Sequence, residues 1–225
     1  MFKVDIPSAY KDKIWQAYTQ PATFLGNKGV ALPAAVEGKQ VTLNRLKGRV
    51  DRNSCLVLQD PQTQAWYKVS TPDETRLLEA EKQGQVASLQ LNQLQQLAQS
   101  IEILNIYLLE RQLPALRSPH LGVSIHALAH EHHHDREFRQ WLAWLLTTAY
   151  WQAIDLLNRF DIWFDDANLG NILLRPSEDG QTAHLVLIDY AGYKRHPQQR
   201  QKDEQILQEL FDIYRRRLED GVSRL

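Results

Sequence analysis

The pattern of apolar and polar positions predicts a strand-rich first half and a helix-rich second half of the chain. Short apolar runs bounded by turn residues predict a three-stranded β-meander at residues 41–46, 54–58 and 65–69. Apolar positions spaced three and four residues apart predict amphipathic helices at residues 8–18, 86–112, 136–159 and 202–218. A further helix is predicted directly after the third strand, where Thr71 and Pro72 form a helix start and Asp73 and Glu74 follow at its positive end.

Lys68 has an unusual position within the predicted third strand. It lies between Tyr67 and Val69, in an apolar setting where an unpaired ammonium group is costly. Such a lysine needs an anionic partner. The alternative is a lysine on an edge strand, where its charge discourages aggregation.

A β-hairpin is predicted later in the chain, from the apolar residues 171–175 and 184–189 and the turn-rich residues between them. The hairpin would bring Asp189, at its end, beside Asp166 and Asn171, at its beginning. This arrangement suits phosphoryl transfer. One carboxylate would orient a hydroxyl group, and the amide oxygen and the second carboxylate would hold a divalent cation. The alternative is an ordinary hairpin with acids at its strand ends.

The segment from Asp166 to Asp189 resembles the catalytic core of protein-kinase-like phosphotransferases. It is most similar to the atypical bacterial branches, which include lipopolysaccharide-sugar kinases and small effector kinases. The resemblance implies that Asp166 is the catalytic base and that Asn171 and Asp189 are metal ligands. The implied cofactors are ATP and Mg²⁺, or Mn²⁺ in its place.

The same resemblance implies roles for residues in the first half. Lys68 would bind the ATP phosphates and pair with a glutamate of the next helix, for which we expect Glu79, with Glu81 as the alternative. The loop around Gly48 would lie over the phosphates. These implied roles complete a nucleotide-binding site.

The fold that the resemblance implies is α+β and bilobal, as in protein kinases. Residues 1–130 would form a small β-rich N-lobe, and residues 131–225 a reduced, mainly helical C-lobe with the catalytic loop and the metal-binding hairpin.

The resemblance implies transfer of the γ-phosphate of ATP to a hydroxyl group. We expect a protein hydroxyl as the substrate, with a sugar or another small molecule as the alternative. Phe164 stands where the family has histidine, and Ala191 where it has glycine. These departures favour a further alternative, a pseudokinase that binds without catalysis.

Composition and charge narrow the possible partners. The chain has 225 residues and a formal net charge of −1, so no overall field attracts nucleic acid or an anionic membrane. It contains no run of 18 apolar residues, so no transmembrane helix is expected. One cysteine, Cys55, fits a reducing compartment. We expect a cytoplasmic protein, or one translocated into a host cell if it is an effector.

Residues 130–134 contain the pattern H-E-x-x-H, which on a helix is the signature of zinc proteases. The two residues between Glu131 and His134 are also histidines, and no third ligand follows at a typical spacing. We therefore interpret the segment as a polar cap or hinge before the next helix. A zinc hydrolase is the third functional alternative.

Overall fold

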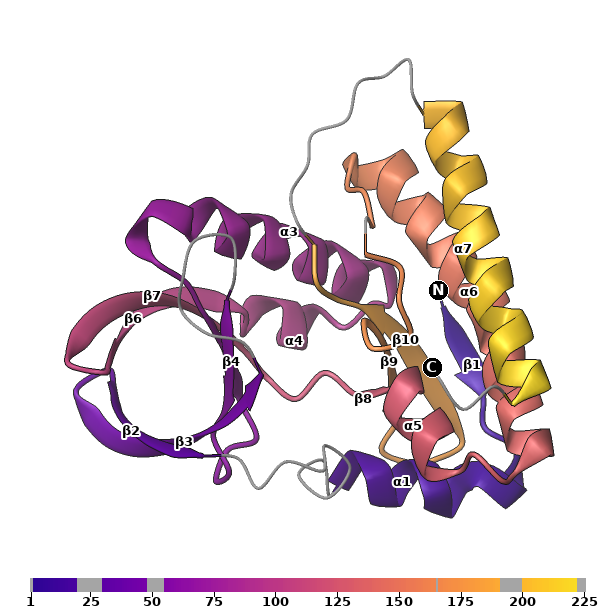
Figure 1. Ribbon diagram of the computed structural model, residues 1–225, viewed down its shortest axis with the longest axis horizontal. Helices are drawn as coiled ribbons and strands as arrows, with labels where there is room; N and C mark the ends of the chain where they lie inside the picture. Colours follow the sequence, from indigo (N-terminus) through magenta and orange to yellow (C-terminus); the bar gives the residue numbers. More distant parts are fainter. Residues whose placement is uncertain (1, 20–29, 48–54, 165, 191–199, 222–225) are drawn as a thin grey trace.

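The computed structural model describes residues 2–19, 30–47, 55–164, 166–190 and 200–221. It consists of a closed β-barrel, a smaller second β-sheet and helices that connect and cover them (Figure 1). The chain is thus α+β, as predicted.

Six antiparallel strands close the barrel in the order β2-β3-β4-β5-β7-β6. The strands are β2 (Ala31–Val36), β3 (Lys39–Lys47), β4 (Leu56–Gln59), β5 (Trp66–Val69), β6 (Glu102–Leu108) and β7 (Arg111–Ser118). Successive side chains of a strand point to opposite faces, so every second one points into the barrel. The fully buried Leu43, Leu58 and Ile106 are among the side chains that fill it. The predicted meander is confirmed as β3, β4 and β5.

The prediction of one helix over residues 86–112 is wrong beyond residue 99. Residues 86–91 and 95–99 are helical, but β6 and β7 begin in the remainder. Leu109 and Glu110 form the turn between these strands, with φ values of 50° and 61°. A two-residue turn with two positive φ values ordinarily uses Asn or Asp followed by Gly, so these residues carry no turn signal. The spacing of Ile101, Leu104 and Leu108 fits a helix, whereas Leu104, Ile106 and Leu108 have the two-residue period of a strand and face the barrel core.

Barrel closure also overturns the predicted bilobal protein-kinase-like fold. That prediction required an open β-rich lobe built from the meander. In the structure β6 pairs with β2 and β7 pairs with β5, so the sheet closes on itself. Of the two strands that close it, β6 comes from residues that the sequence pattern assigned to a helix, and β7 begins at the end of that predicted helix.

The second sheet has four strands in the order β1-β10-β9-β8. They are β1 (Lys3–Asp5), β8 (Val123–Ser124), β9 (Ile172–Pro176) and β10 (Thr182–Leu187). The antiparallel pairing of β9 with β10 confirms the predicted hairpin. The expected boundary at residue 130 stays a prediction, although β1 and β8 precede it and pair with strands that follow it.

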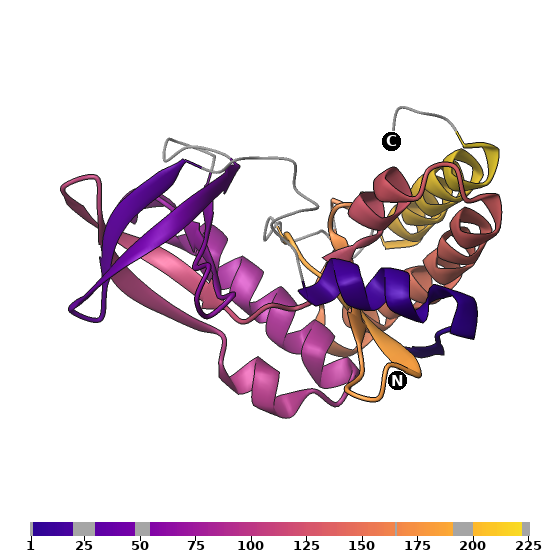
Figure 2. The ribbon, with the colours of Figure 1, turned by 90° about the horizontal axis from the view of Figure 1, so that it is seen from below.

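Helix α3 (Thr75–Leu91) joins the barrel to the second sheet, as Figure 2 shows from below. It follows the short 3₁₀ helix η2 (Pro72–Glu74), which confirms the predicted helix start. Leu78 and Leu89 of α3 pack in one buried cluster with Leu116 of the barrel and Leu173 and Val186 of the second sheet. One helix therefore positions the two sheets relative to each other.

The remaining helices pack around the second sheet. They are η1 (Ser8–Tyr10), α1 (Lys11–Thr19), α4 (Gln95–Gln99), α5 (Ile125–Glu131), α6 (Arg136–Phe160) and α7 (Arg200–Asp220). Predicted helices 8–18, 136–159 and 202–218 are confirmed. Helices α6 and α7 lie side by side, with the rings of Tyr150 and Phe211 5.9 Å apart. Among the described residues, no helix combines the length and apolar character needed to cross a bilayer.

The segment between the barrel and the second sheet is held by a half-buried histidine. The ring of His120 stacks on Tyr18 with centroids 4.6 Å apart, and its Nε2 lies 3.0 Å from the Tyr18 carbonyl oxygen. Arg175 of β9 donates a hydrogen bond to the His120 carbonyl. Burial lowers the pKa of His120 to about 4, against the hydrogen bond to Tyr18 and together with the nearby Arg175 charge.

Acid is therefore expected to destabilise the protein before its carboxylates titrate. Between pH 6.5 and pH 4 the unfolded chain protonates His120 and the folded chain does not, so the free energy of unfolding falls as pH falls, by up to about 3 kcal/mol from this residue. Urea unfolding at several pH values should show a shallower fall in His120→Gln. The control is His133→Gln, which removes an exposed histidine. Equal slopes in the two variants would contradict this assignment.

Candidate functional site

Lys68 lies between two carboxylates that come from different parts of the fold. Tyr67 and Val69 point into the barrel, so Lys68 points outward, toward α3. Its Nζ is 3.1 Å from Oε2 of Glu81 on α3 and 2.5 Å from Oδ1 of Asp189, just after β10. One ammonium group thus connects the barrel, the joining helix and the second sheet.

The surroundings of Lys68 favour its charged form. Burial by itself disfavours the ammonium, but the charges of Glu81 and Asp189 outweigh it and raise the pKa of Lys68 above its ordinary value. The interpretation as an edge-strand lysine is wrong, because β5 is paired on both sides, with β4 and β7. Its side chain is only 22% exposed.

The expected partner Glu79 is wrong, and the alternative Glu81 takes its place. Glu79 is exposed, whereas Glu81 is only 1% exposed. The physical reason is the helical period. Leu78 is fully buried, and the residue three positions later shares its face while its immediate neighbour does not. The same periodicity would have selected Glu81 from the sequence.

Polar side chains along α3 hydrogen-bond to the backbone of β10 and the residues after it. Asn92 Nδ2 donates to the Leu185 carbonyl at 2.7 Å, and Ser88 Oγ accepts from the Leu187 N–H at 3.0 Å. Strand β1 pairs with residues 182–184 of β10. The two residues that α3 contacts, Leu185 and Leu187, follow this paired part of the strand. Sequence analysis missed Ser88 and Asn92. Both could have been noticed in the sequence, because they are polar side chains at positions that recur on the buried face of a helix.

Glu81, also on α3, makes the same kind of side-chain contact with the backbone just after β10. Its Oε1 accepts from the Asp189 N–H at 2.9 Å, and its Oε2 accepts from the Tyr190 N–H at 2.7 Å. Asp189 has a φ of 68°, a left-handed conformation that is unfavourable for a residue with a side chain. Glu81 therefore holds both the ammonium of Lys68 and the backbone that directs Asp189.

A glycine of α3 makes room for Tyr190. A Cβ atom built on Gly84 would lie 2.1 Å from a ring carbon of Tyr190, far inside contact distance. The Tyr190 ring is buried, and its hydroxyl donates to the Leu187 carbonyl at 3.1 Å. The absence of a side chain at residue 84 is what lets α3 approach the segment that carries Asp189.

Gly84→Ala is accordingly expected to destabilise the protein by about 1–3 kcal/mol, through the clash with Tyr190. Glycine to alanine inside a helix otherwise stabilises by about 1 kcal/mol, so the sign of the change separates the two effects. Urea unfolding should show this cost, and should show it reduced or reversed when the same change is made in a Tyr190→Ala background. A stabilising effect in the wild-type background would refute the contact.

Asp166 and Asn171 are joined at the adjoining end of β9. Asn171 Nδ2 donates to Oδ2 of Asp166 at 2.9 Å and to its carbonyl at 3.0 Å. Asn171 is buried and Asp166 is exposed. The Ile188 N–H, next to Asp189, donates to the Asn171 carbonyl at 3.0 Å. The two strand ends thus bring together the three residues that the sequence analysis selected.

Carboxylate and amide oxygens are hard ligands of the kind that Mg²⁺ prefers. Asp189 and Asn171 supply one of each, and Asp189 is 34% exposed. Within the described ranges, no three His, Cys, Asp or Glu side chains come together in a way that could hold a metal ion. A cation at Asp189 and Asn171 would need further oxygens, and Mg²⁺ typically takes these from water and substrate phosphates. Asp189 and Asn171 could therefore supply two of the oxygen ligands of such a cation.

Two residues implied by the resemblance lie outside the described part of the chain. They are Gly48, expected over the phosphates, and Ala191, which follows Tyr190. Phe164 is described, and it is buried with its ring 5.7 Å from that of Tyr190. The apolar side chain at residue 164 therefore stabilises this part of the chain by packing against Tyr190.

The zinc signature does not have the geometry that a zinc hydrolase requires. Helix α5 ends at Glu131, so His130 and His134 do not share a helix face. Asp135 caps the next helix by accepting from the Phe138 N–H at 2.9 Å. The segment is a helix end followed by a capped helix start, as the interpretation of a polar cap predicted.

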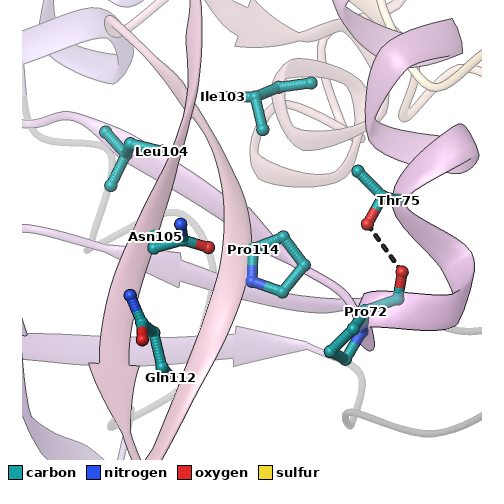
Figure 3. A pocket seen from close by; sticks show the side chains of 7 residues that line it. All are labelled: Pro72, Thr75, Ile103, Leu104, Asn105, Gln112 and Pro114. Carbon is teal, nitrogen blue, oxygen red and sulfur yellow. Dashed lines mark hydrogen bonds between the residues drawn. The ribbon is translucent and has the colours of Figure 1, made fainter.

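A separate hollow of about 460 Å³ lies on the outside of the barrel, where η2 and α3 begin (Figure 3). It is lined by Pro72, Thr75, Ile103, Leu104, Asn105, Gln112 and Pro114. The Thr75 hydroxyl donates to the Pro72 carbonyl at 2.8 Å. These lining residues are uncharged and include none of the residues around Lys68.

Neither models of known protein families nor curated proteins give a match to this chain. The case for a function therefore rests on the arrangement around Lys68.

Proposed function

We propose that the protein is an ATP- and Mg²⁺-dependent phosphotransferase that transfers the γ-phosphate to a hydroxyl group. The observation that carries the proposal is the position of the Lys68 ammonium, held by the buried Glu81 and in contact with Asp189. Asp166 and Asn171 lie at the adjoining strand end. The proposal takes its chemistry from these residues and does not require a protein-kinase fold.

The proposed roles follow from charge and exposure. Lys68 would contact phosphate oxygens, since an ammonium is a point charge that binds phosphate well. Asp189 and Asn171 would hold Mg²⁺, which when bound supplies charge neutralisation for the phosphate oxygens. Asp166 is exposed and oriented by Asn171, so it can hydrogen-bond to an incoming hydroxyl and accept its proton.

We propose a protein hydroxyl as the substrate, with a sugar or small-molecule hydroxyl as the alternative. The exposure of Asp166 supports a bulky substrate, because a hydroxyl on the surface of another protein can reach an exposed carboxylate. Use of ATP favours a cytoplasmic location.

The binding half of the proposal is tested by thermal unfolding with ATP and Mg²⁺ or Mn²⁺. A ligand at 100 times its dissociation constant should stabilise the protein by about 2.7 kcal/mol. The shift should require the metal and should disappear in Asp189→Asn, a variant that keeps a residue type tolerant of the left-handed backbone. Glu178→Ala, which removes an exposed acid from the turn of the same hairpin, is the control.

An equal shift in wild type and Asp189→Asn would remove Asp189 from the site. No shift in either protein would overturn the nucleotide-binding proposal. Metal-dependent binding without transfer of labelled γ-phosphate to any protein or sugar acceptor would favour the pseudokinase alternative.

A further inference from the structure

The outward face of α6 carries two exposed tryptophans. Trp144 is 54% exposed and Trp151 is 56% exposed, although Trp is a large and usually well-buried residue. Their spacing of seven residues places them on one side of the helix, opposite the face that enters the core. Figures 1 and 2 show α6 and α7 on the side of the molecule away from the barrel.

The stretch of α6 that carries these tryptophans is uncharged. Residues 140–154 contain no Asp, Glu, Lys or Arg. Gln140 and Thr147, which share the outward face, are both exposed. Single exposed apolar residues are common on proteins, but two aligned indoles on an uncharged stripe are typical of a contact surface.

We propose that a second copy of this chain covers the face, with the two α6 helices packed antiparallel about a twofold axis beside Thr147. A twofold interface must be self-complementary, so that residue i meets residue j and j meets i. Trp144 and Trp151 lie at nearly equal distances on either side of Thr147. An antiparallel pair therefore places Trp144 of each helix against the partner's Trp151, twice.

The charges at the ends of the helix select the antiparallel arrangement. Glu137 lies near the beginning of α6 and Arg159 near its end, and both are exposed. In antiparallel packing Glu137 lies near the partner's Arg159, and the pair occurs twice. Parallel packing would instead bring like charges together. Arg159 also pairs with Asp155 of its own helix at 3.2 Å, which leaves its exposed guanidinium able to donate further.

The available area fits a dimer of modest affinity. Half-exposed indoles on two copies supply together about 500 Å² of apolar surface, given 150–250 Å² for a whole aromatic side chain. A specific interface buries about 1,200–2,000 Å² in total, so the rest must come from the flanking residues of a helix about 37 Å long. We therefore expect dissociation in the micromolar range, the weak end for protein interfaces.

Sedimentation velocity of the full chain from about 1 to 100 µM tests the dimer across the range expected for an interface of this size. The wild type should shift from monomer to dimer, and Trp144→Arg or Trp151→Arg should raise the dissociation constant at least tenfold. Trp15→Arg is the matched control, because Trp15 is 43% exposed on α1 and lies outside the face. Circular dichroism of each variant checks that the helices remain folded.

Disulfide trapping tests the orientation of the helices. In a Cys55→Ser background, which removes the single native cysteine, Thr147→Cys should form a covalent dimer on mild oxidation. Gln140→Cys should not, because antiparallel packing places it far from the partner's Gln140. Trapping at both positions would indicate parallel helices and overturn the proposed geometry.

A chain that stays monomeric at all concentrations would overturn the proposal. So would a dimer that Trp15→Arg weakens as much as Trp151→Arg does. If the monomer instead sediments with neutral or anionic vesicles through Trp144 and Trp151, the face belongs to a lipid surface and not to a second copy.

Discussion

Asp166→Asn is expected to lower the rate of phosphoryl transfer by about 10²- to 10⁴-fold, the range typical of a general base. The change keeps the size of the side chain and an oxygen that can accept from Asn171, but removes the carboxylate that accepts the hydroxyl proton. The affinity for ATP and Mg²⁺ should change only a few-fold. Initial rates with labelled ATP, alongside binding by calorimetry, separate the two quantities. The prediction rests on the proposed function.

Asp179→Asn is the matched control for Asp166→Asn. Asp179 is an exposed aspartate in the turn of the same hairpin, at the end away from Asn171. The control should transfer phosphate at the wild-type rate. If Asp166→Asn also retained the wild-type rate, Asp166 would not be the base, although the nucleotide site could still stand.

Glu81→Ala is expected to destabilise the protein by about 3–5 kcal/mol, the usual cost of removing one partner of a buried ion pair. The Lys68 ammonium would lose the 3.1 Å contact, and the N–H groups of Asp189 and Tyr190 would lose their acceptor. Urea unfolding measures the change. Glu79→Ala removes an exposed glutamate from the same helix and should alter the free energy of unfolding by no more than about 0.5 kcal/mol.

A double variant separates the ion pair from packing. Lys68→Met combined with Glu81→Leu removes both charges and keeps comparable volume, so part of the lost stability should return. Recovery should be incomplete, since the backbone of Asp189 and Tyr190 still lacks the Glu81 oxygens. A Glu81→Ala cost no larger than that of Glu79→Ala would mean that the ion pair contributes little to stability.

The stability predictions for Gly84 and Glu81 share one structural cause, which is the position of α3. Glu81 binds a barrel lysine with the same carboxylate that accepts from the backbone at Asp189. Ser88 and Asn92 bind the preceding residues of β10 in the same way. A displacement of α3 would therefore change the surroundings of Lys68 and of Asp189 together.

The local pattern of the sequence was sufficient for elements with a strong period or a clear boundary. Strands β3, β4 and β5, the hairpin of β9 and β10, and helix α6 were all predicted, because apolar spacing reports directly on which face is buried. The hairpin also brought Asp166, Asn171 and Asp189 to one end, since antiparallel strands return the chain to its start.

Only the tertiary structure decided how distant elements meet. The strands β6 and β7 close the barrel by pairing with β2 and β5, and their turn at Leu109 and Glu110 has none of the usual turn residues. The space at Gly84 for Tyr190, and the contacts of Glu81 with both Lys68 and the backbone at Asp189, depend on how α3 is placed between the two sheets. Such contacts join residues far apart in the chain, and no local period encodes them.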